Sequence, residues 1–239
     1  MKVDFIYDIH QDLWNYFFRY IEPVKDKTHE LNTILQGRPS IPVEVKLLIE
    51  NIDKLYDTEW CDTAVDIYDY LHEKIEKSPA LARSVKDIRI EWEKYEKRYF
   101  SQLAEYFQVS KIRNMRGYLT SINGFPYNAK AGTFFVPIFN DIGKRINVIM
   151  HETMHIVFRD NYEEKMRKAG LGDDGVFLVT EAFADLLNTR FKEINPIKEA
   201  PKSKAKGGTK SIIDKIDELN ESDIKFLDKL EELIKIVKK

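Results

Sequence analysis

The sequence lacks the features that mark disulfide-bonded, membrane-spanning and nucleic-acid-binding proteins. Its 239 residues include a single cysteine, Cys61, which excludes an internal disulfide and fits a reducing compartment. No run of about 18 apolar residues occurs, which excludes an ordinary transmembrane helix. With 38 basic and 40 acidic residues the formal net charge is −2, so charge gives no reason to expect nucleic acid or a membrane surface as a partner.

The N-terminal residues also lack an export signal. Lys2 supplies one positive charge, but Asp4, Asp8 and Asp12 interrupt the apolar stretch that a signal peptide needs. We therefore expect a cytoplasmic protein. Its hydrophobic content of 43% and aromatic content of 12% are sufficient for a sizeable core in one or two domains.

The most informative pattern that is present is His-Glu-Thr-Met-His at residues 151–155. On a helix, His151 and His155 share one face and can reach a single zinc ion. Glu152 is offset by one residue, so it is not part of that pair and is free to deprotonate a zinc-bound water. The motif therefore predicts metal binding together with general-base catalysis.

The residues around the motif favour a buried helix. They are uncharged and free of proline, as an unkinked helix in a core requires. The alternative is a core helix that happens to carry two histidines. Without a metal, however, that helix would bury three polar groups at a cost of several kcal/mol.

A catalytic zinc site needs a third protein ligand, and Glu181 is the best candidate. It lies 26 residues after His155, beyond a glycine-rich stretch at 170–175 that breaks the helical pattern. The chain can therefore return on a second helix, expected at about 176–190. Asp185 shares a helical face with Glu181 and can hydrogen bond to a ligand histidine. The competitors Asp173, Asp174 and Glu164 lack such a pairing.

The pair of motifs His-Glu-Thr-Met-His and Thr-Glu-Ala-Phe-Ala-Asp resembles the gluzincins, the thermolysin-like clan of zinc metallopeptidases. The resemblance covers about 65 residues. It implies that His151, His155 and Glu181 are zinc ligands, that Glu152 is the general base and that Asp185 is the hydrogen-bonding partner of His151. Tyr127-Asn128-Ala129 resembles the Asn-Ala with which these enzymes bind substrate backbone on an edge strand, which implies substrate-binding roles for Asn128 and Ala129.

The sequence departs from this clan in the residues after the third ligand. Thermolysin-like enzymes carry a histidine there that stabilises the tetrahedral intermediate, but no histidine or tyrosine occurs after Tyr162. A stabiliser must therefore come from elsewhere, and Tyr118, Tyr127, Tyr162 and Arg190 are all candidates. Nothing in the sequence selects one of them.

The fold class expected from the whole chain is α+β, with a zincin-like core between helical ends. Residues 1–107 show helical spacing, and a long helix is predicted at Pro79–Phe107. Short extended runs at Met115–Ile122 and Thr133–Phe139 predict a small sheet, in which Pro137 places the second run at an edge or ends it. The expected regions are 1–107 helical, 108–192 catalytic core, 193–210 flexible linker and 211–239 helical tail.

These observations predict a zinc-dependent metallopeptidase that hydrolyses peptide bonds of a peptide or protein substrate. Whether it is an endopeptidase or an aminopeptidase is open. The alternative is a non-catalytic zincin-like zinc-binding protein that binds or regulates a partner, and the C-terminal helices offer a surface for a protein partner. A structural zinc site has no use for Glu152, which favours the enzyme.

Overall fold

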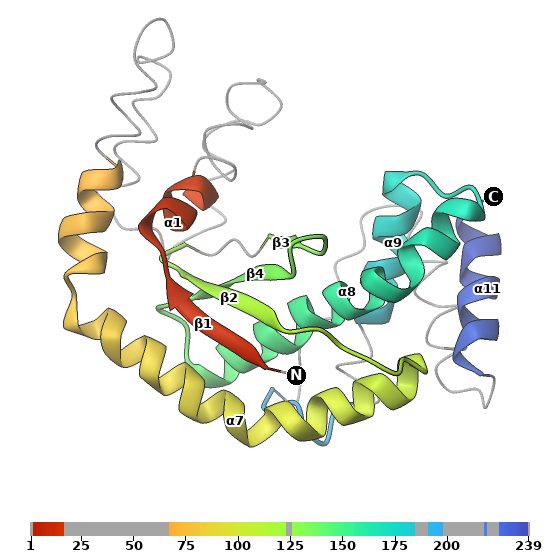
Figure 1. Ribbon diagram of the computed structural model, residues 1–239, viewed down its shortest axis with the longest axis horizontal. Coiled ribbons are helices and arrows are strands. Elements are labelled where there is room, and N and C mark those ends of the chain that lie inside the picture. The colour runs from red at the N-terminus through yellow and green to blue at the C-terminus, as the bar shows by residue number, and fades with distance from the viewer. Residues whose placement is uncertain are drawn as a thin grey trace, which may run out of the picture.

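The computed structural model describes residues 2–16, 67–122, 126–184, 191–197, 218 and 225–238. These residues form an α+β fold, as the sequence predicts: a four-stranded mixed sheet with helices packed around it (Figure 1). The strands are β1 Val3–Tyr7, β2 Met115–Thr120, β3 Tyr127–Asn128 and β4 Thr133–Pro137. The helices are α1 Ile9–Tyr16, η2 Leu71–Glu76, α7 Pro79–Phe107, α8 Ile142–Lys168, α9 Asp173–Ala184 and α11 Phe226–Val237.

The strand order across the sheet is β1-β2-β4-β3. β1, β2 and β4 are parallel to their neighbours, whereas β3 runs antiparallel to β4 and forms one edge. Phe5, Gly117 and Phe134 are in register on the three parallel strands. A Cβ at Gly117 would lie 2.8 Å from the Phe5 ring, so glycine on the central strand leaves room for the phenylalanines on either side.

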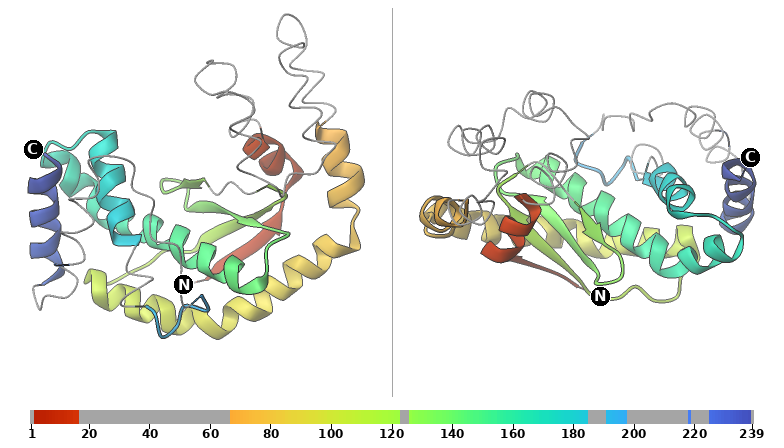
Figure 2. Two further views of the ribbon diagram at one scale, coloured as in Figure 1. Left: turned by 180° about the vertical axis from the view of Figure 1, so that it is seen from behind. Right: turned by 90° about the horizontal axis from the view of Figure 1, so that it is seen from above.

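The two faces of the sheet are covered by different helices. α7 packs on β1 and on α8, and α8 packs on β4 and β3, whereas α1 lies on β2 from the other side (Figure 2). Burial alternates at the start of β1 and β2, as the two-residue period of a strand predicts, whereas residues 134–137 of β4 are all buried because both faces of that strand are covered. The hydrophobic core lies between the sheet and the α7–α8 layer.

The long helix α7 has the predicted bounds, and local chemistry explains where it begins and ends. Ser78 caps its N-terminus by accepting a hydrogen bond from the backbone N–H of Ala80, and Pro79 stands at the first helical position, where a missing N–H costs nothing. It ends at Gln108 in the left-handed conformation. Trp92 and Tyr99 on its aromatic stripe are buried, so the stripe forms core.

Two expectations about the strands need correction. Residues 3–7 lie in the region expected to be helical, yet they form β1, because Val3 and Phe5 face the core and the strand pairs along its whole length with β2. The Thr133–Phe139 run is an inner strand rather than an edge, because β3 pairs with its outer side. It does end at Pro137, as the missing N–H of proline predicts.

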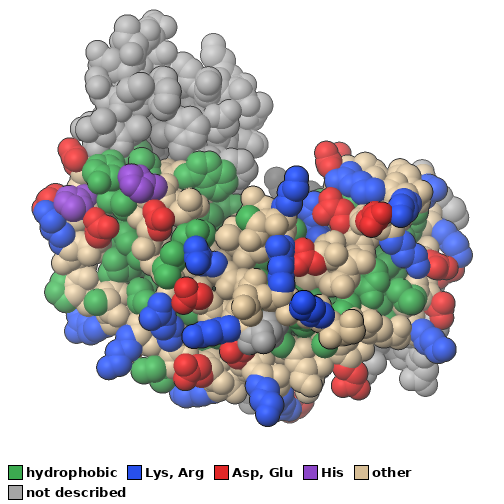
Figure 3. Space-filling model, in the orientation of Figure 1, with side chains coloured by type: hydrophobic (Ala, Val, Ile, Leu, Met, Phe, Trp, Pro, Cys, Tyr) green, Lys and Arg blue, Asp and Glu red, His purple; other side chains and the backbone are tan. Residues whose placement is uncertain are grey.

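The C-terminal helix α11 packs against α9. Its Phe226 enters a cluster of aromatic rings from α7, α8 and α9, with centroids 5.0 Å from Phe107, 5.0 Å from Tyr162 and 5.2 Å from Phe183. On the surface shown in Figure 3, acidic and basic side chains are interspersed. Among the described residues, no helix has both the length and the apolar character needed to cross a bilayer.

Candidate metal centre

The helix α8 carries the His-Glu-Thr-Met-His motif in its middle, where it is well anchored. Asp141 caps its N-terminus, accepting a hydrogen bond from the N–H of Lys144 at 2.9 Å. Next to the motif, the hydroxyl of Tyr99 on α7 donates to the carbonyl oxygen of Met150 at 2.5 Å. Because consecutive turns of the helix stack, His151 and His155 lie one above the other, and the ring of His155 is 1% exposed.

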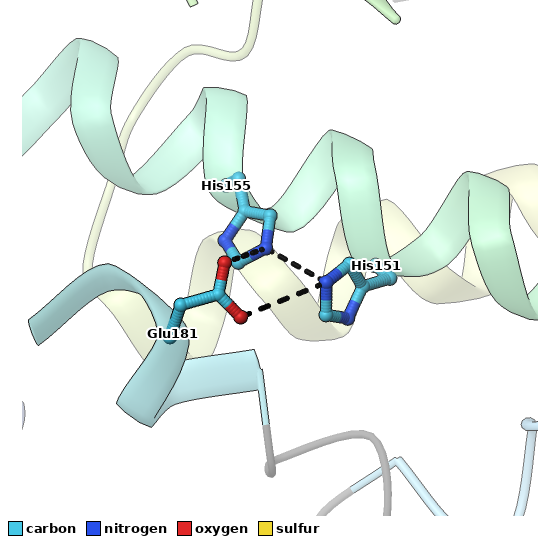
Figure 4. Close-up of side chains that lie close together, drawn as sticks. All are labelled: His151, His155 and Glu181. Carbon is cyan, nitrogen blue, oxygen red and sulfur yellow. Dashed lines mark hydrogen bonds and ion pairs between the residues drawn. The ribbon is translucent and has the colours of Figure 1, made fainter. Parts of the chain in front are cut away.

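The helix α9 brings Glu181 to the same place. The loop between the helices turns at Gly170, which has a φ of +93°. Figure 4 shows the carboxylate of Glu181 facing both imidazoles. Its Oε1 lies 3.3 Å from Nε2 of His155 and its Oε2 lies 4.0 Å from Nε2 of His151, and the two Nε2 atoms are 2.8 Å apart. These three residues form a group that could hold a metal ion.

The separations between these atoms fit a tetrahedral zinc site. Bonds of about 2.0–2.1 Å at tetrahedral angles place ligand atoms about 3.3 Å apart. The three observed separations, 2.8, 3.3 and 4.0 Å, are distributed around that value. Two imidazole nitrogens and one carboxylate are also the donor set of many catalytic zinc sites, and they leave a fourth position for water.

Burial prepares the two histidines to act as ligands. It lowers the pKa of both His151 and His155, and for His155 the neighbouring imidazole of His151 and the positive charge of Arg159 add to the effect. Both imidazoles are therefore neutral near pH 7, and a neutral imidazole has a lone pair to donate to a metal. The Nδ1 atom of His155 is buried and has no hydrogen-bond partner among the described residues.

Glu152 lies in the same environment but is not one of the three grouped residues. It is 6% exposed, and burial raises the pKa of its carboxyl well above the ordinary value, with a further contribution from the nearby charge of Glu181. A carboxylate with a raised pKa is a stronger base than one in water. The structure therefore places a buried carboxyl beside the candidate ligands.

The structure separates the four candidates for a stabiliser of the tetrahedral intermediate. Tyr127 on β3 lies against the triad, because its ring stacks on that of His155 with centroids 4.9 Å apart. Tyr162 donates to the carbonyl oxygen of Phe107 in the aromatic cluster, and Tyr118 packs on Phe135. Arg190 lies outside the described residues, as does Asp185, the expected partner of His151.

Asn128 ends the edge strand β3 and Ala129 begins the turn that follows it, and the Asn128 side chain already has an intramolecular contact. Its Oδ1 accepts a hydrogen bond from the N–H of Ala131 at 2.9 Å and so stabilises the turn between β3 and β4. Ala129 is buried, and its carbonyl oxygen accepts a hydrogen bond from Arg113. Both residues shape the edge strand.

Sequence reasoning missed Arg159 and Glu163, which come after the motif on α8. Their spacing at one and two turns after His155 places them on the same helical face, and this periodicity was the available signal. Together with β3 and α1 they border a cavity of about 900 Å³, which no triad residue lines but which Tyr127, stacked on His155, connects to the triad. Its other lining residues are His10, Gln11, Trp14, Pro126, Tyr127, Asn128, Ala129, Lys130, Thr133, Phe135 and Asp160.

No protein-family model, curated protein or solved structure matches the chain. The chemistry open to these residues is therefore inferred from their geometry and from the resemblance of the two motifs to the gluzincins.

Proposed function

We propose that the protein is a zinc-dependent metallopeptidase. The observation that carries this proposal is the convergence of His151, His155 and Glu181 from two helices, with the buried carboxyl of Glu152 next to them. A purely structural zinc site would gain nothing from this second carboxyl, because burying it costs free energy and the ligand set is already formed without it.

The three ligands would hold zinc with one position open. Zinc bound there would polarise a substrate carbonyl and make a water molecule acidic enough to lose a proton near neutral pH. Glu152 accepts that proton and later gives it to the leaving amine, which requires a carboxyl that is a base at neutral pH and is not itself a ligand. Burial around His155 and Glu152 keeps competing solvent away from the reacting groups.

The edge strand β3 supports a peptide as the substrate. It lies next to α8 and, among the described strands, pairs only with β4, so its other side can pair with an extended chain. The cavity of about 900 Å³ that borders β3 provides room for side chains of such a chain.

The proposal is tested with the variant Glu152→Gln. We expect it to keep its fold and about one zinc per chain, because Glu152 is not a ligand, but to lose peptide cleavage by several orders of magnitude. Glu164→Gln is the matched control, because it makes the same change on the same helix at an exposed side chain that pairs with Lys168. Cleavage is measured by mass spectrometry on an unbiased peptide library, and zinc by elemental analysis.

Three results would count against the peptidase. A native protein that contains no zinc would overturn the metal site. Cleavage that survives in Glu152→Gln or in the presence of a chelator would overturn the role of Glu152 or of the metal. Stoichiometric zinc without cleavage by the native protein would favour the non-catalytic zinc-binding protein instead.

A further inference from the structure

The ring of His155 lacks the contact that usually fixes a zinc-binding histidine. Such a residue normally donates its second ring N–H to a carboxylate or carbonyl group, which holds the ring in place and raises its affinity for the metal. In His155 the atom facing the triad is Nε2, so the second nitrogen is Nδ1. This Nδ1 is fully buried and has no hydrogen-bond partner among the described residues.

The imidazole of His155 makes an aromatic contact through its face instead. The Tyr127 ring lies nearly parallel to the imidazole of His155, with an interplanar angle of 22° and centroids 4.9 Å apart. Burial raises the pKa of the Tyr127 hydroxyl, so the residue stays neutral. The stacked ring restricts the rotation of His155 without needing a polar partner.

Tyr127 is itself held by a chain of charged side chains along α8. Arg159, one turn after His155, hydrogen bonds to the Tyr127 hydroxyl, and its guanidinium carbon lies 5.8 Å from the ring centroid. Glu163, one turn further, accepts two hydrogen bonds from Arg159, at 2.7 Å from Nε and 2.9 Å from Nη2. This bidentate geometry orients the guanidinium more strictly than a single contact would.

A second connection fixes the strand that carries Tyr127. Arg113 donates to the carbonyl oxygens of Ala129 and Lys130 in the β3–β4 turn. Its Nε and Nη2 also contact the carboxylate of Asp160 on α8, at 2.7 and 2.9 Å. Gly132, at a φ of +69°, leaves the space that this guanidinium occupies. β3 is thus tied to the metal-binding helix independently of Arg159.

We propose that Tyr127, oriented by Arg159 and Glu163, is the positioning residue for the zinc ligand His155 and fulfils the role that a hydrogen-bonded carboxylate has in other zinc sites. The proposal rests on the proposed metal site and concerns how tightly the metal is held. It assigns to the edge strand a function in addition to substrate binding: part of the metal affinity depends on β3.

The test separates the ring of Tyr127 from its hydroxyl. Zinc affinity is measured by competition with a chromophoric chelator. We expect Tyr127→Ala to weaken zinc binding by about 10–100-fold, the range found for lost supporting contacts, and Tyr127→Phe to stay within about threefold of the native protein. Arg159→Met keeps the ring but removes the guanidinium that contacts both its face and its hydroxyl, so we expect a loss between those of Tyr127→Phe and Tyr127→Ala. Tyr118→Ala is the matched control. Tyr118 lies on β2 and packs on Phe135 of β4, so this variant should bind zinc normally.

A spectroscopic measurement distinguishes positioning from a general loss of stability. The visible absorption bands of Co²⁺ bound in place of zinc report the ligand geometry. They should change in Tyr127→Ala and stay native in Tyr127→Phe and Tyr118→Ala. Should Tyr127→Ala fail to fold, Tyr127→Leu and Arg159→Met provide the same comparison.

The outcomes are distinguishable from those for the peptidase. Native zinc affinity and a native cobalt spectrum in Tyr127→Ala would overturn the positioning role while leaving the metal site and Glu152 untouched. Equal losses in Tyr127→Ala and Tyr118→Ala would show that the effect is one of sheet stability and would also overturn it. A native protein that binds neither metal would remove the basis of both proposals.

Discussion

Glu181 and the two histidines illustrate how a buried polar cluster depends on each member. The carboxylate lies 3.3 Å from His155, whose ring is almost fully buried, and its neighbour Glu152 is buried as well. Placing such groups in a protein interior without partners costs several kcal/mol, so the cluster is unfavourable unless a ligand completes it. A bound divalent cation would balance the acidic charge and satisfy the lone pairs of the imidazoles.

The ligand set makes a prediction for zinc binding. His155→Ala and Glu181→Ala should each abolish tight binding, because each removes one of three ligands, while Asp185→Ala should weaken binding by about 10–100-fold as a supporting contact does. His72→Ala is the control, because His72 is partly exposed and pairs with Glu76, away from the triad. Zinc content after gel filtration and chelator competition measure these effects. Near-native affinity in both Glu181→Ala and Asp185→Ala would contradict the geometry.

The residues of the candidate site that could be predicted from the sequence are those related by helical spacing. His151, Glu152 and His155 are neighbours on one helix, so their mutual geometry is set by the helical period alone. Glu181 was accessible through its spacing and its resemblance to a known pattern. The contact of Tyr127 with His155 could not be foreseen, because it depends on how β3 packs on α8, which no local pattern encodes.

At the level of elements, the docking of α1 on β2 depends on a buried carboxyl. Asp12 is fully buried and accepts hydrogen bonds from the Thr120 hydroxyl at 2.6 Å, from the Ser121 hydroxyl at 2.8 Å and from the Ser121 N–H. The Tyr7 hydroxyl adds a fourth donor at 3.2 Å. Burial nevertheless dominates and raises the pKa of Asp12 from 3.8 to about 6.

This pKa predicts how pH affects the free energy of unfolding. Because the folded state holds the Asp12 proton more tightly than the unfolded state, the contribution is fully present below about pH 4 and is lost as pH rises through about 6. A shift of this size corresponds to about 3 kcal/mol. This contribution is measured by urea unfolding at pH 4 and pH 7.5 in the presence of a chelator. It is the difference in free energy of unfolding between the native protein and Asp12→Asn.

The comparison with Asp12→Asn isolates the carboxyl. Other groups whose pKa changes on folding, such as His151 and His155, are common to both proteins and cancel. Asp69→Asn makes the same change at an exposed residue and serves as the control. A difference between native protein and Asp12→Asn that is constant across this range would show that Asp12 is ionised to the same extent folded and unfolded.

Helix α7 has a strong local sequence signal and could be predicted, whereas strand β1 is defined by its pairing with a distant strand and could not. The apolar period and the Ser78-Pro79 start specify α7. β1 has only five residues, one of them Asp4, and precedes a helix directly, so its helical neighbours obscured it. Its partner β2 lies more than 100 residues later, and such long-range pairing leaves no mark in a local window.

At the level of the whole molecule, an aromatic cluster joins four helices next to the candidate metal site. Phe107 from α7, Phe158 from α8, Phe183 from α9 and Phe226 from α11 meet with centroid separations between 4.9 and 6.4 Å. Phe158 is three residues after His155, and Phe183 is two residues after Glu181. The two helices that supply the ligands therefore pack against each other through a cluster that α11 completes.

We therefore expect α11 to stabilise the packing of the two helices that carry the candidate ligands. A single substitution tests this expectation. Phe226→Ala should lower the free energy of unfolding by about 3–5 kcal/mol, because it leaves a cavity beside four buried rings. Leu227→Ala, on the same helix but 38% exposed, should change it by less than about 0.5 kcal/mol. Denaturant unfolding without metal gives both values.

Adding zinc extends the test from the core to the site. Zinc at about 100 times its Kd stabilises a folded protein with an intact site by about 2.7 kcal/mol. The full gain is expected for Leu227→Ala, and a smaller gain at the same zinc concentration for Phe226→Ala, since α9 then holds Glu181 less firmly. Equal gains would show that α11 stabilises the fold without influencing the metal ligands. If the gains differ, a chain shortened at about residue 190 should also bind zinc more weakly than the full-length chain, because it lacks α11.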